Sequence, residues 1–539
     1  MSARPWFSQY DAGVPFQLTY PEVCVHDLLT RIVVENEQRV AIESGGRSIT
    51  YGEIDQASTN MATHLVALGV MPGEVVGICL TNSSEFVISF FAILKSGGVV
   101  AAMNPAFPKR ELQFQVAGTG MRIVITSGEK AKDFVEIAGE KESITHLILR
   151  EECEGVESRG LVRELRYRDL ISDGAVDTRL PSIYPSQAAV VQFSGGTTGT
   201  PKAALGSHHN LVSNATQFRR WLVNLEDSQE TFLIAIPLYH VYGLVLGLIL
   251  GVACAAKMVI IEHPGNVDEI IEAIRNYPIS YFPAVPTIFQ RINQHADVIH
   301  RKISLATIKA CISGSAPLLD SVRREFESNT GGSLVEGYGL SEAPTATHCN
   351  PILGQKRSGS IGLPLPDVDC RIVSMEDGVT EVSTGMEGEL LVRGPQVMLG
   401  YLNAPEDNKL SLRDGWLRTG DIARMDKDGY FYLAGRIKDL IKVHGMQVWP
   451  SEVEVVVNQH PAVMECAVAG VLDEKSGERV KVWVVLRPGM SLSHTDLIEF
   501  CRGKLAAYKI PVEMETRENL PRTSVGKVLR RVLVEENKT

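Results

Sequence analysis

Short runs of β-branched residues alternate with amphipathic segments through most of this chain. Val75–Leu80, Ile123–Thr126 and Ala188–Phe193 are such runs, and Ser83–Leu94 and Val267–Arg275 are amphipathic. Strands that alternate with helices favour largely parallel sheets covered by helices. The sequence therefore predicts an α/β architecture of layered sheets and helices.

The length of the chain and a change in its pattern indicate a second domain. At 539 residues the chain is too long for one compact core. Beyond Val368, alternating runs are broken by Gly and Asp turns, which is typical of antiparallel strands. A small α+β unit follows, with helices expected at Glu452–Asn458 and Thr495–Leu505 and strands at Glu465–Val471 and Val480–Leu486. We predict a large N-terminal domain, residues 1–435, joined by a hinge to a smaller α+β C-terminal domain, residues 436–539.

The charge and the cysteines disfavour several classes of protein. A net charge of −11 gives no general attraction to phosphate backbones, so we expect no nucleic-acid partner. The 9 cysteines include no C-x-x-C pair, which argues against a disulfide framework and favours a reducing compartment. The first residues hold no apolar segment of a signal peptide. We therefore expect a cytoplasmic protein and leave open a peripheral association with membranes. The oligomeric state is not readable from the sequence.

One apolar stretch, Leu233–Ala256, resembles a membrane span in composition. Pro237 and His240 interrupt its first half, and Val241–Ala256 is shorter than the roughly 20 residues that a span requires. We expect a buried strand followed by a core helix, and no integral membrane span. A membrane transporter is the alternative, and solubility of the expressed protein would distinguish the two.

A glycine-rich loop follows the strand predicted at 188–193 and reads SGGTTGTPK. Its glycines let the backbone approach a ligand and turn N–H groups toward it, and its hydroxyls and lysine add further donors. The loop suits a polyphosphate, but it is not a Walker A loop, because Gly199 is followed by Thr-Pro-Lys. A flexible connector is the alternative. The candidate phosphate contacts are Ser194, Gly195, Gly196, Thr197, Thr198, Gly199 and Lys202.

The loop resembles the signature of the adenylate-forming superfamily, which includes acyl-CoA synthetases, aryl-CoA ligases, firefly luciferase and peptide-synthetase adenylation domains. Gly195 stands where Ser is common in that signature, and Ala203 where Gly is common. Further motifs of the superfamily follow in order, so that the resemblance spans roughly Ile49 to Arg531. The N-terminal segment Pro5–Pro15, together with Glu342-Ala343-Pro344, is closest to bacterial medium- and long-chain fatty acid ligases.

The resemblance implies a role for each nucleotide-binding motif. Tyr338 would stack on adenine, Ser341 would contact phosphate, and Glu342 would bind Mg²⁺, which suits a hard carboxylate. Asp421 would accept hydrogen bonds from the ribose hydroxyls. The remaining ATP and AMP contacts implied are Ser315, Ala316, Glu336, Gly337, Gly339 and Arg436.

The same resemblance implies the catalytic, hinge and CoA-binding residues. Lys527 would bridge the carboxylate and the α-phosphate, and His240 would line the acyl site. Lys438 would be the interdomain hinge. Lys442, His444 and Gly445 would meet CoA. The alternative for His240 is a satisfied core histidine, and the alternative for Lys527 is a basic tail.

Together these motifs predict an ATP- and Mg²⁺-dependent acyl-CoA ligase. It would adenylate a carboxylic acid and then pass the acyl group to CoA. The resemblance implies a medium- or long-chain fatty acid as that substrate. An aryl acid or a carrier-protein acceptor is the alternative within this class. A nucleotide-binding regulator without chemistry is the alternative outside it. A hydrolase is disfavoured, because neither G-x-S-x-G nor H-E-x-x-H occurs.

We expect Lys527→Ala to abolish adenylation from ATP while it largely spares thioester formation from a supplied acyl-adenylate. The reason is that the cation is needed only while two anions are brought together. ATP–pyrophosphate exchange and thioester formation, measured separately, check this expectation. Full exchange activity in the variant would contradict the role of Lys527.

Overall fold

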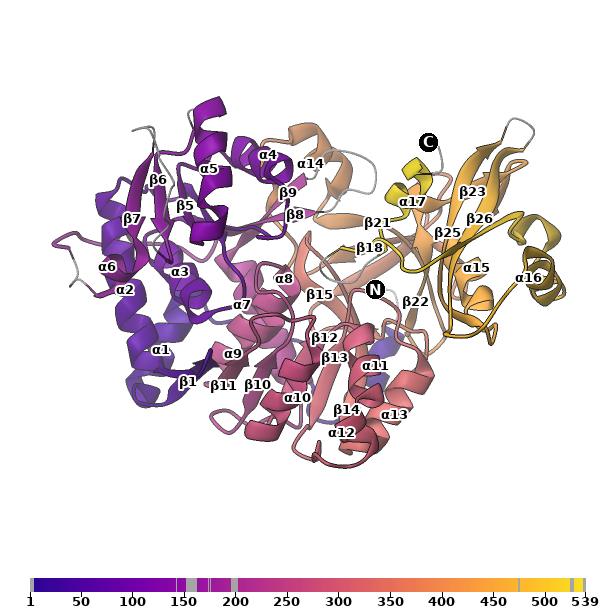
Figure 1. Ribbon diagram of the computed structural model, residues 1–539, viewed down its shortest axis with the longest axis horizontal. Helices are drawn as coiled ribbons and strands as arrows, with labels where there is room; N and C mark the ends of the chain where they lie inside the picture. The colour runs from indigo at the N-terminus through magenta and orange to yellow at the C-terminus, as the bar shows by residue number, and fades with distance from the viewer. Residues whose placement is uncertain are drawn as a thin grey trace.

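The structure has the predicted layered α/β architecture. This computed structural model describes residues 4–141, 143–151, 162–172, 174, 176–194, 202–473, 476–523 and 528–536. A large α/β body lies beside a smaller α+β domain, which Figure 1 draws in orange and yellow at the right. The predicted fold class is confirmed. The boundary after residue 435 stays a prediction, and strand β22 (Phe431–Arg436) runs across it.

One sheet of the large body is mostly parallel, with the strand order β16-β15-β14-β13-β12-β10-β11-β1-β2. Strands β2, β15 and β16 are antiparallel to their neighbours, and the other pairs are parallel. The strands are β1 (Val40–Ser44), β2 (Arg47–Thr50), β10 (Thr231–Ile234), β11 (Lys257–Ile260), β12 (Tyr281–Ala284), β13 (Ala310–Ser313), β14 (Ser333–Leu340), β15 (Ala343–Cys349) and β16 (Leu363–Pro364). In Figure 1 the helices α10 (Val267–Asn276), α11 (Pro286–Gln294), α12 (Ala296–Ile299) and α13 (Asp320–Thr330) lie in front of it.

A second sheet has the order β19-β9-β8-β4-β3-β5-β6-β7. Its pairs are parallel from β8 to β7 and antiparallel at β8–β9 and β9–β19. The strands are β3 (Val75–Cys79), β4 (Val99–Ala102), β5 (Ile123–Thr126), β6 (His146–Leu149), β7 (Arg163–Arg166), β8 (Ala188–Ser194), β9 (Lys202–Ser207) and β19 (Gly400–Tyr401). The helices joined to it are α2 (Tyr51–Ala67), α3 (Ser84–Lys95), α4 (Lys109–Thr119), α5 (Gly128–Lys141), α6 (Tyr167–Ser172) and α7 (His208–Trp221).

Alternate residues of the second sheet enter two different cores. Val76 and Ile78 of β3 join the main core, which also contains residues of the first sheet. Val75 and Cys79 face the other way, into a cluster that includes Phe134 of α5. Because side chains of a strand alternate between faces, a strand buried on both faces is apolar throughout. This explains why VVGIC is a continuous apolar run.

The C-terminal part of the chain holds two antiparallel-rich sheets. One has the order β17-β18-β21-β20, with β22 also paired to β21, and the other has the order β24-β23-β26-β25, with β27 paired to β26. The strands of the first are β17 (Asp369–Val373), β18 (Gly388–Arg393), β20 (Leu412–Arg413) and β21 (Trp416–Met425). Those of the second are β23 (Ile441–Val443), β24 (Met446–Val448), β25 (Val463–Asp473), β26 (Gly477–Leu486) and β27 (Glu513–Arg517). The other helices are η1 (Pro5–Gln9), α1 (Val25–Asn36), α14 (Pro405–Ser411), η3 (Ile437–Asp439), α15 (Pro450–Val457), α16 (His494–Cys501), η4 (Ala507–Lys509) and α17 (Arg530–Glu536).

The helix predicted at Thr495–Leu505 is shorter in the structure, where α16 ends at Cys501. Arg502 already has an extended backbone (ψ 136°), and Gly503 adopts a left-handed conformation (φ 76°). A glycine in the left-handed conformation commonly ends a helix. The prediction overlooked Gly503 as such a signal and therefore extended the helix beyond its end. The predicted strands at 465–471 and 480–486 lie within the longer strands β25 and β26.

The apolar stretch Leu233–Ala256 is part of the core, as predicted. It contains the end of β10, the short helices α8 (Val241–Gly243) and α9 (Leu250–Ala253), and a π-helix between them, η2 (Leu244–Ile249). All residues of η2 are buried. Among the described residues, no helix has the length and apolar character needed to cross a bilayer.

The two glycines of this stretch serve close packing. A Cβ on Gly243 would lie 2.3 Å from the carbonyl oxygen of Pro237, and a Cβ on Gly247 would lie 3.0 Å from Cδ1 of Ile234. The backbone oxygen of Pro237 cannot move aside easily, whereas the side-chain methyl of Ile234 can. Contact with the preceding strand and turn therefore accounts for glycine at both positions.

We expect Gly243→Ala to destabilise the protein by about 1–3 kcal/mol through overpacking against Pro237. Gly247→Ala is the matched control. Its new methyl meets only a movable methyl of Ile234, and alanine gains up to about 1 kcal/mol of helix propensity over glycine. Urea unfolding of both variants measures the difference, and equal midpoints for the two would contradict the packing argument.

Candidate functional site

Several predicted nucleotide residues lie where β13 and β14 end. Parallel strands bring their carboxyl ends to one edge of a sheet, which is where open α/β sheets bind ligands. Beyond β13, Ser315 adopts a positive φ of 71° and is exposed, and Ala316 is half-buried. On β14, a Cβ at Gly339 would lie 1.6 Å from the carbonyl oxygen of Thr345, so a glycine is required there. Its neighbour Ser341 is half-buried.

Glu336 on β14 has an unusual environment. It is the register partner of Ser313 on β13, and the amide of Leu318 donates to its Oε2 at 3.3 Å. Burial raises the pKa of the Glu336 carboxyl to about 8, against the opposing effect of that amide. The carboxyl is therefore mostly protonated at neutral pH. Next to it, Gly337 faces the Ile312 side chain, which would lie 3.3 Å from an added Cβ.

Asp421 joins two of the predicted nucleotide residues. It lies on β21, directly opposite Arg436 on β22. Arg436 Nε donates to Asp421 Oδ1 at 2.6 Å, and the Tyr338 hydroxyl donates to Oδ2 at 2.5 Å. The carboxylate is buried, and charge-assisted hydrogen bonds of this kind are the strong ones. The structure thus brings Tyr338, Asp421 and Arg436 together, although the chain separates them widely.

The surroundings keep the Tyr338 phenol protonated. Burial, and then the negative charge of Asp421, raise the pKa of Tyr338 well above its usual value. Its ring meets His348 edge-on, with ring centroids 5.8 Å apart. Burial lowers the pKa of His348 to about 3, so that ring is neutral. Tyr338 is therefore a hydrogen-bond donor held in one position. Its predicted stacking on adenine stays a prediction.

A second group forms around Tyr401 on β19. Its hydroxyl donates to Glu342 Oε1 at 2.9 Å, and Lys202 Nζ lies 5.1 Å from the centre of its ring. Lys202 also forms an ion pair with Asp407 of α14. Because β19 pairs with β9, with Tyr401 opposite Ala204, the sheet itself brings the predicted phosphate lysine toward the predicted metal ligand.

The group at Glu342 fits Mg²⁺. The carboxylate supplies the hard oxygen that this ion prefers, and the hydrogen bond from Tyr401 fixes its orientation. Burial, and then the charge of Glu342, raise the pKa of Tyr401, so its hydroxyl remains a donor. That Glu342 binds Mg²⁺ is still a prediction. The hydrogen bond from Tyr401 is a structural reason to expect its carboxylate in a fixed orientation.

His240 is placed by its own backbone. It is the N-cap of α8, and its Nδ1 accepts a hydrogen bond from the amide of Tyr242 at 3.2 Å. Burial lowers the pKa of His240 to about 4, so the ring is neutral at physiological pH. Tyr242 in turn donates to the carbonyl oxygen of Ile312, at the end of β13. The segment predicted to line the acyl site therefore contacts the strand that leads to Ser315.

The predicted hinge and CoA residues follow β22 directly. Lys438 is exposed in η3, and Lys442 is exposed on β23. His444 and Gly445 form the tight loop between β23 and β24, with φ values of 50° and 79°. Two successive positive φ values mark a type I′ hairpin turn, which explains the choice of glycine. The His444 amide donates to the carbonyl oxygen of Ser476 at 2.9 Å.

Some predicted residues fall outside the described part of the chain. These are Lys527 and the loop residues Gly195, Gly196, Thr197, Thr198 and Gly199. Of Ser194 only the backbone is described, and it is the register partner of Lys202. Both ends of the predicted phosphate loop are therefore neighbours in the sheet.

Sequence reasoning missed Tyr401, Asp407 and His348. Gly400-Tyr401 lies in a segment with no marked pattern, and only the pairing of β19 with β9 gives it a place beside Lys202. His348 lies on the buried strand β15, where a lone histidine gives no signal by itself. Comparison with related sequences is the signal that would have found them.

The AMP-binding enzyme family matches residues 29–402, and its C-terminal domain matches residues 452–527. The long-chain-fatty-acid–CoA ligase of Bacillus subtilis (strain 168) is 35% identical over 99% of this chain and 98% of its own. An anthranilate CoA ligase solved with anthranoyl-AMP has a TM-score of 0.84 and 27% identity over 96% of this chain and 98% of its own. The ATP-bound MatB from Rhodopseudomonas palustris has a TM-score of 0.84 and 28% identity over 96% of this chain and 99% of its own.

This chain therefore belongs to the AMP-binding enzyme family. It is an acyl-CoA ligase, an enzyme of the acid–thiol ligase class. The predicted superfamily, with fatty acid–CoA ligases among its near relatives, is confirmed.

We expect Tyr401→Phe to raise the Mg²⁺ concentration needed for half-maximal pyrophosphate release by about 10- to 100-fold, because loss of an outer-shell hydrogen bond to a metal ligand typically has that effect. A titration of Mg²⁺ at fixed ATP measures it. Tyr432→Phe is the matched control, since the Tyr432 hydroxyl also donates to a carboxylate, that of Asp426 at 3.1 Å. A shift of equal size in both variants would argue against a specific role for Tyr401.

Proposed function

We propose that this ligase activates a medium- or long-chain fatty acid in two steps. The acid first attacks the α-phosphate of ATP to give an acyl-adenylate and pyrophosphate. The CoA thiol then displaces AMP to give the acyl-CoA. The observation that carries the proposal is the likeness, over 99% of this chain, to a relative named as a long-chain-fatty-acid–CoA ligase.

The first step needs positive charge, because a carboxylate and a triphosphate repel one another. The residues proposed to supply it are Lys202, the first residue of β9, and Lys527. Bound at Glu342, Mg²⁺ would neutralise phosphate oxygens. Lys202 has to leave Asp407 in order to reach a phosphate, and exchange of one anion for a more highly charged one favours that movement.

Asp421 is proposed to hold the ribose. Its carboxylate already accepts hydrogen bonds from Tyr338 and Arg436, and an ionised carboxylate has room for about four. The ribose hydroxyls can therefore donate to the same carboxylate beside Tyr338 and Arg436, or they can replace one of these two donors. Arg436, once released, would be free to reach a phosphate oxygen. This shared carboxylate would couple nucleotide binding to the strand that leads into the hinge.

The second step requires a different arrangement, because a thiol now attacks from the CoA side. We propose that the C-terminal domain turns about Lys438, which lies in η3 immediately after β22. Such a rotation would take Lys527 away and bring the β23–β24 hairpin, with Lys442, His444 and Gly445, toward the adenylate. An exposed hairpin with a tight turn is a rigid element that such a movement can carry intact.

An aryl acid is the competing substrate. It is favoured by the likeness to an anthranilate CoA ligase at a TM-score of 0.84. The two substrates differ in length and width, so the lining of the acyl site near His240 decides between them. The extra methylenes of an alkyl chain add about 0.8 kcal/mol each when buried, which makes chain length a sensitive measure of the site.

A panel of acids tests the proposal, with the purified chain, ATP, Mg²⁺ and CoA. We expect kcat/KM to rise with alkyl chain length from butanoate to hexadecanoate, and to be at least about tenfold lower for benzoate and anthranilate than for the best alkyl acid, a difference of about 1.4 kcal/mol. AMP release and acyl-CoA mass are the measurements. A preference for an aryl acid would overturn the fatty acid assignment. Pyrophosphate release without acyl-CoA would point instead to another acceptor.

A further inference from the structure

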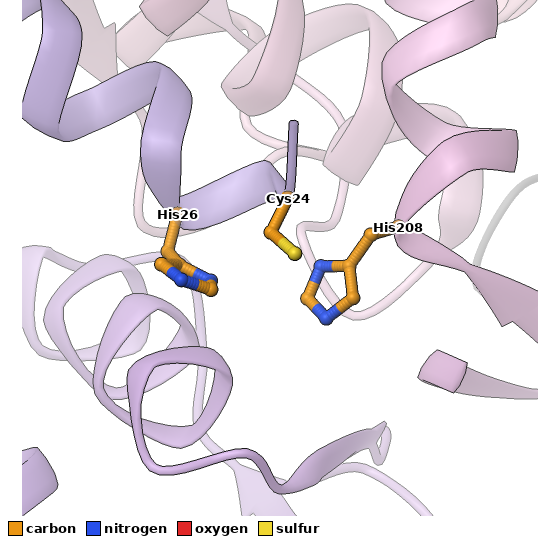
Figure 2. Close-up of side chains that lie close together, drawn as sticks. All are labelled: Cys24, His26 and His208. Carbon is orange, nitrogen blue, oxygen red and sulfur yellow. The ribbon is translucent and has the colours of Figure 1, made fainter. Parts of the chain in front are cut away.

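A cluster of sulfur and nitrogen donors lies where helices α1 and α7 begin. Cys24 and His26 stand at the start of α1, and His208 is the first residue of α7 (Figure 2). One donor atom from each residue lies within 4.8 Å of the donor atoms of the other two. In Figure 2 the Cys24 sulfur and the two imidazole rings gather in one place between the two helix starts.

The three side chains are poorly exposed, and one buried nitrogen among them has no polar partner within the described residues. Cys24 and His208 are buried, and 15% of the His26 side chain is exposed. The Val25 amide donates to His208 Nδ1 at 3.2 Å. Within the described residues the buried Nδ1 of His26 has no hydrogen-bond partner. Buried polar atoms in folded proteins almost always have a hydrogen-bond partner, so the site as it stands is incomplete.

We propose that Cys24, His26 and His208 bind a transition-metal ion that prefers thiolate and imidazole ligands, with Zn²⁺ as the first candidate. Zinc is held by cysteine sulfur at about 2.3 Å and by histidine nitrogen at about 2.0–2.1 Å. Donors around one such ion lie about 3.3–3.8 Å apart by that geometry. The present spacing therefore needs a contraction of about 1 Å, which side-chain rotation at two helix ends can provide.

The surroundings of each ligand suit this role. We assign Nδ1 of His26 as its donor, and its other nitrogen, Nε2, then faces Asp27 Oδ1 at 3.6 Å. Metal-bound histidines commonly direct their second nitrogen to a carboxylate. Nδ1 of His208 accepts the hydrogen bond of the Val25 amide, so this nitrogen carries a lone pair that a metal ion could take.

Binding requires one proton to leave. The Cys24 thiol gives up its proton to solvent as the sulfur–zinc bond forms, and the ion replaces the Val25 amide as the partner of His208 Nδ1. The released amide stands at the N-terminus of α1, beside the new thiolate. Helix N-termini stabilise anionic sulfur, so the amide gains a better acceptor than the one it loses.

A cavity reaches one of the three proposed ligands, His26. It has a volume of about 230 Å³ and is lined by His26, Thr30, Asp55, Thr59, Lys95, Leu180 and Pro181. Lys95 does not repel a cation strongly there, because its Nζ is paired with Asp55 Oδ1 at 2.7 Å and also donates to the Thr59 hydroxyl at 2.9 Å. An entry path is one of the features that a metal site must have.

The ion would fasten the N-terminal helix α1 to the helix α7. α7 follows β9 without a gap, and β9 begins at Lys202, at the end of the predicted phosphate loop. The site would therefore fix the far end of the strand that carries one of the nucleotide residues. A structural role, with no step of the reaction at the metal, is the consequence.

The test uses the full chain, freed of metal by a chelator and kept reduced. Zn²⁺ is titrated in competition with a chromophoric zinc indicator, with Mg²⁺ in excess to occupy hard oxygen sites. We expect one tightly bound equivalent, and a loss of affinity of at least about 100-fold in Cys24→Ser and in His26→Asn. Cys466→Ser is the control variant, because that thiol lies in the other domain, where it donates to the carbonyl oxygen of Glu454 at 3.7 Å.

A second measurement does not depend on the folding of any variant. Co²⁺ in place of Zn²⁺ should give the unmodified chain a thiolate-to-cobalt charge-transfer absorption, which Zn²⁺ then abolishes. Any of three results overturns the proposal. The cobalt absorption is missing, the protein fails to take Zn²⁺ from the indicator, or Cys24→Ser binds Zn²⁺ as tightly as Cys466→Ser does.

Discussion

The buried carboxylate of Asp421 holds together the residues that we propose bind the nucleotide. It connects β14, through the Tyr338 hydroxyl, with β22, through Arg436. These strands belong to different sheets, so a single side chain fixes their relative position at the edge where ligands would bind. A buried charge is stable only while it is paired, and here both donors come from residues that the nucleotide itself is expected to engage. With the nucleotide bound as proposed, its binding and the packing of these two sheets would be linked.

The second sheet also brings distant residues together, through the backbone pairing of its strands. Strand β9 lies between β8 and β19, so that Ser194, Lys202 and Tyr401 come from three strands that are neighbours in space. Tyr401 then reaches Glu342, which follows β14 of the first sheet. The first sheet thus meets the sheet of β21 and β22 at Asp421, and it meets the second sheet at Glu342, so that an acidic group stands at each meeting point. A site assembled in this way depends on the register of the sheets, because a shift of one residue would turn each side chain to the opposite face.

Much of this arrangement could be predicted from the sequence, and the reasons differ from residue to residue. The strands at 75–79 and 123–126 were predictable because burial on both faces leaves a continuous apolar run. Motifs identified the candidate residues Tyr338, Glu342, Asp421 and Arg436. The motifs do not say which of these side chains contact one another. The bond between Tyr338 and Asp421 depends on a pairing of distant strands, which no local pattern encodes. Tyr401 and the cluster of Cys24, His26 and His208 escaped for the same reason, since each becomes meaningful only once the chain is folded.

The π-helical turn at Leu244–Ile249 has a consequence for how this enzyme can vary. A π turn holds one residue more than the α-helical turn it replaces, and removal of a residue there would restore regular α geometry without breaking the segment. Each residue of an α-helix turns the chain by about 100°, so such a deletion would rotate His240 and its neighbours relative to the buried helix α9. A single deletion could in this way redirect the segment that we propose lines the acyl site, and leave the rest of the core in place. With the acyl site placed as proposed, the length of the chain in this stretch, and not only the identity of its side chains, would tune which acids are accepted.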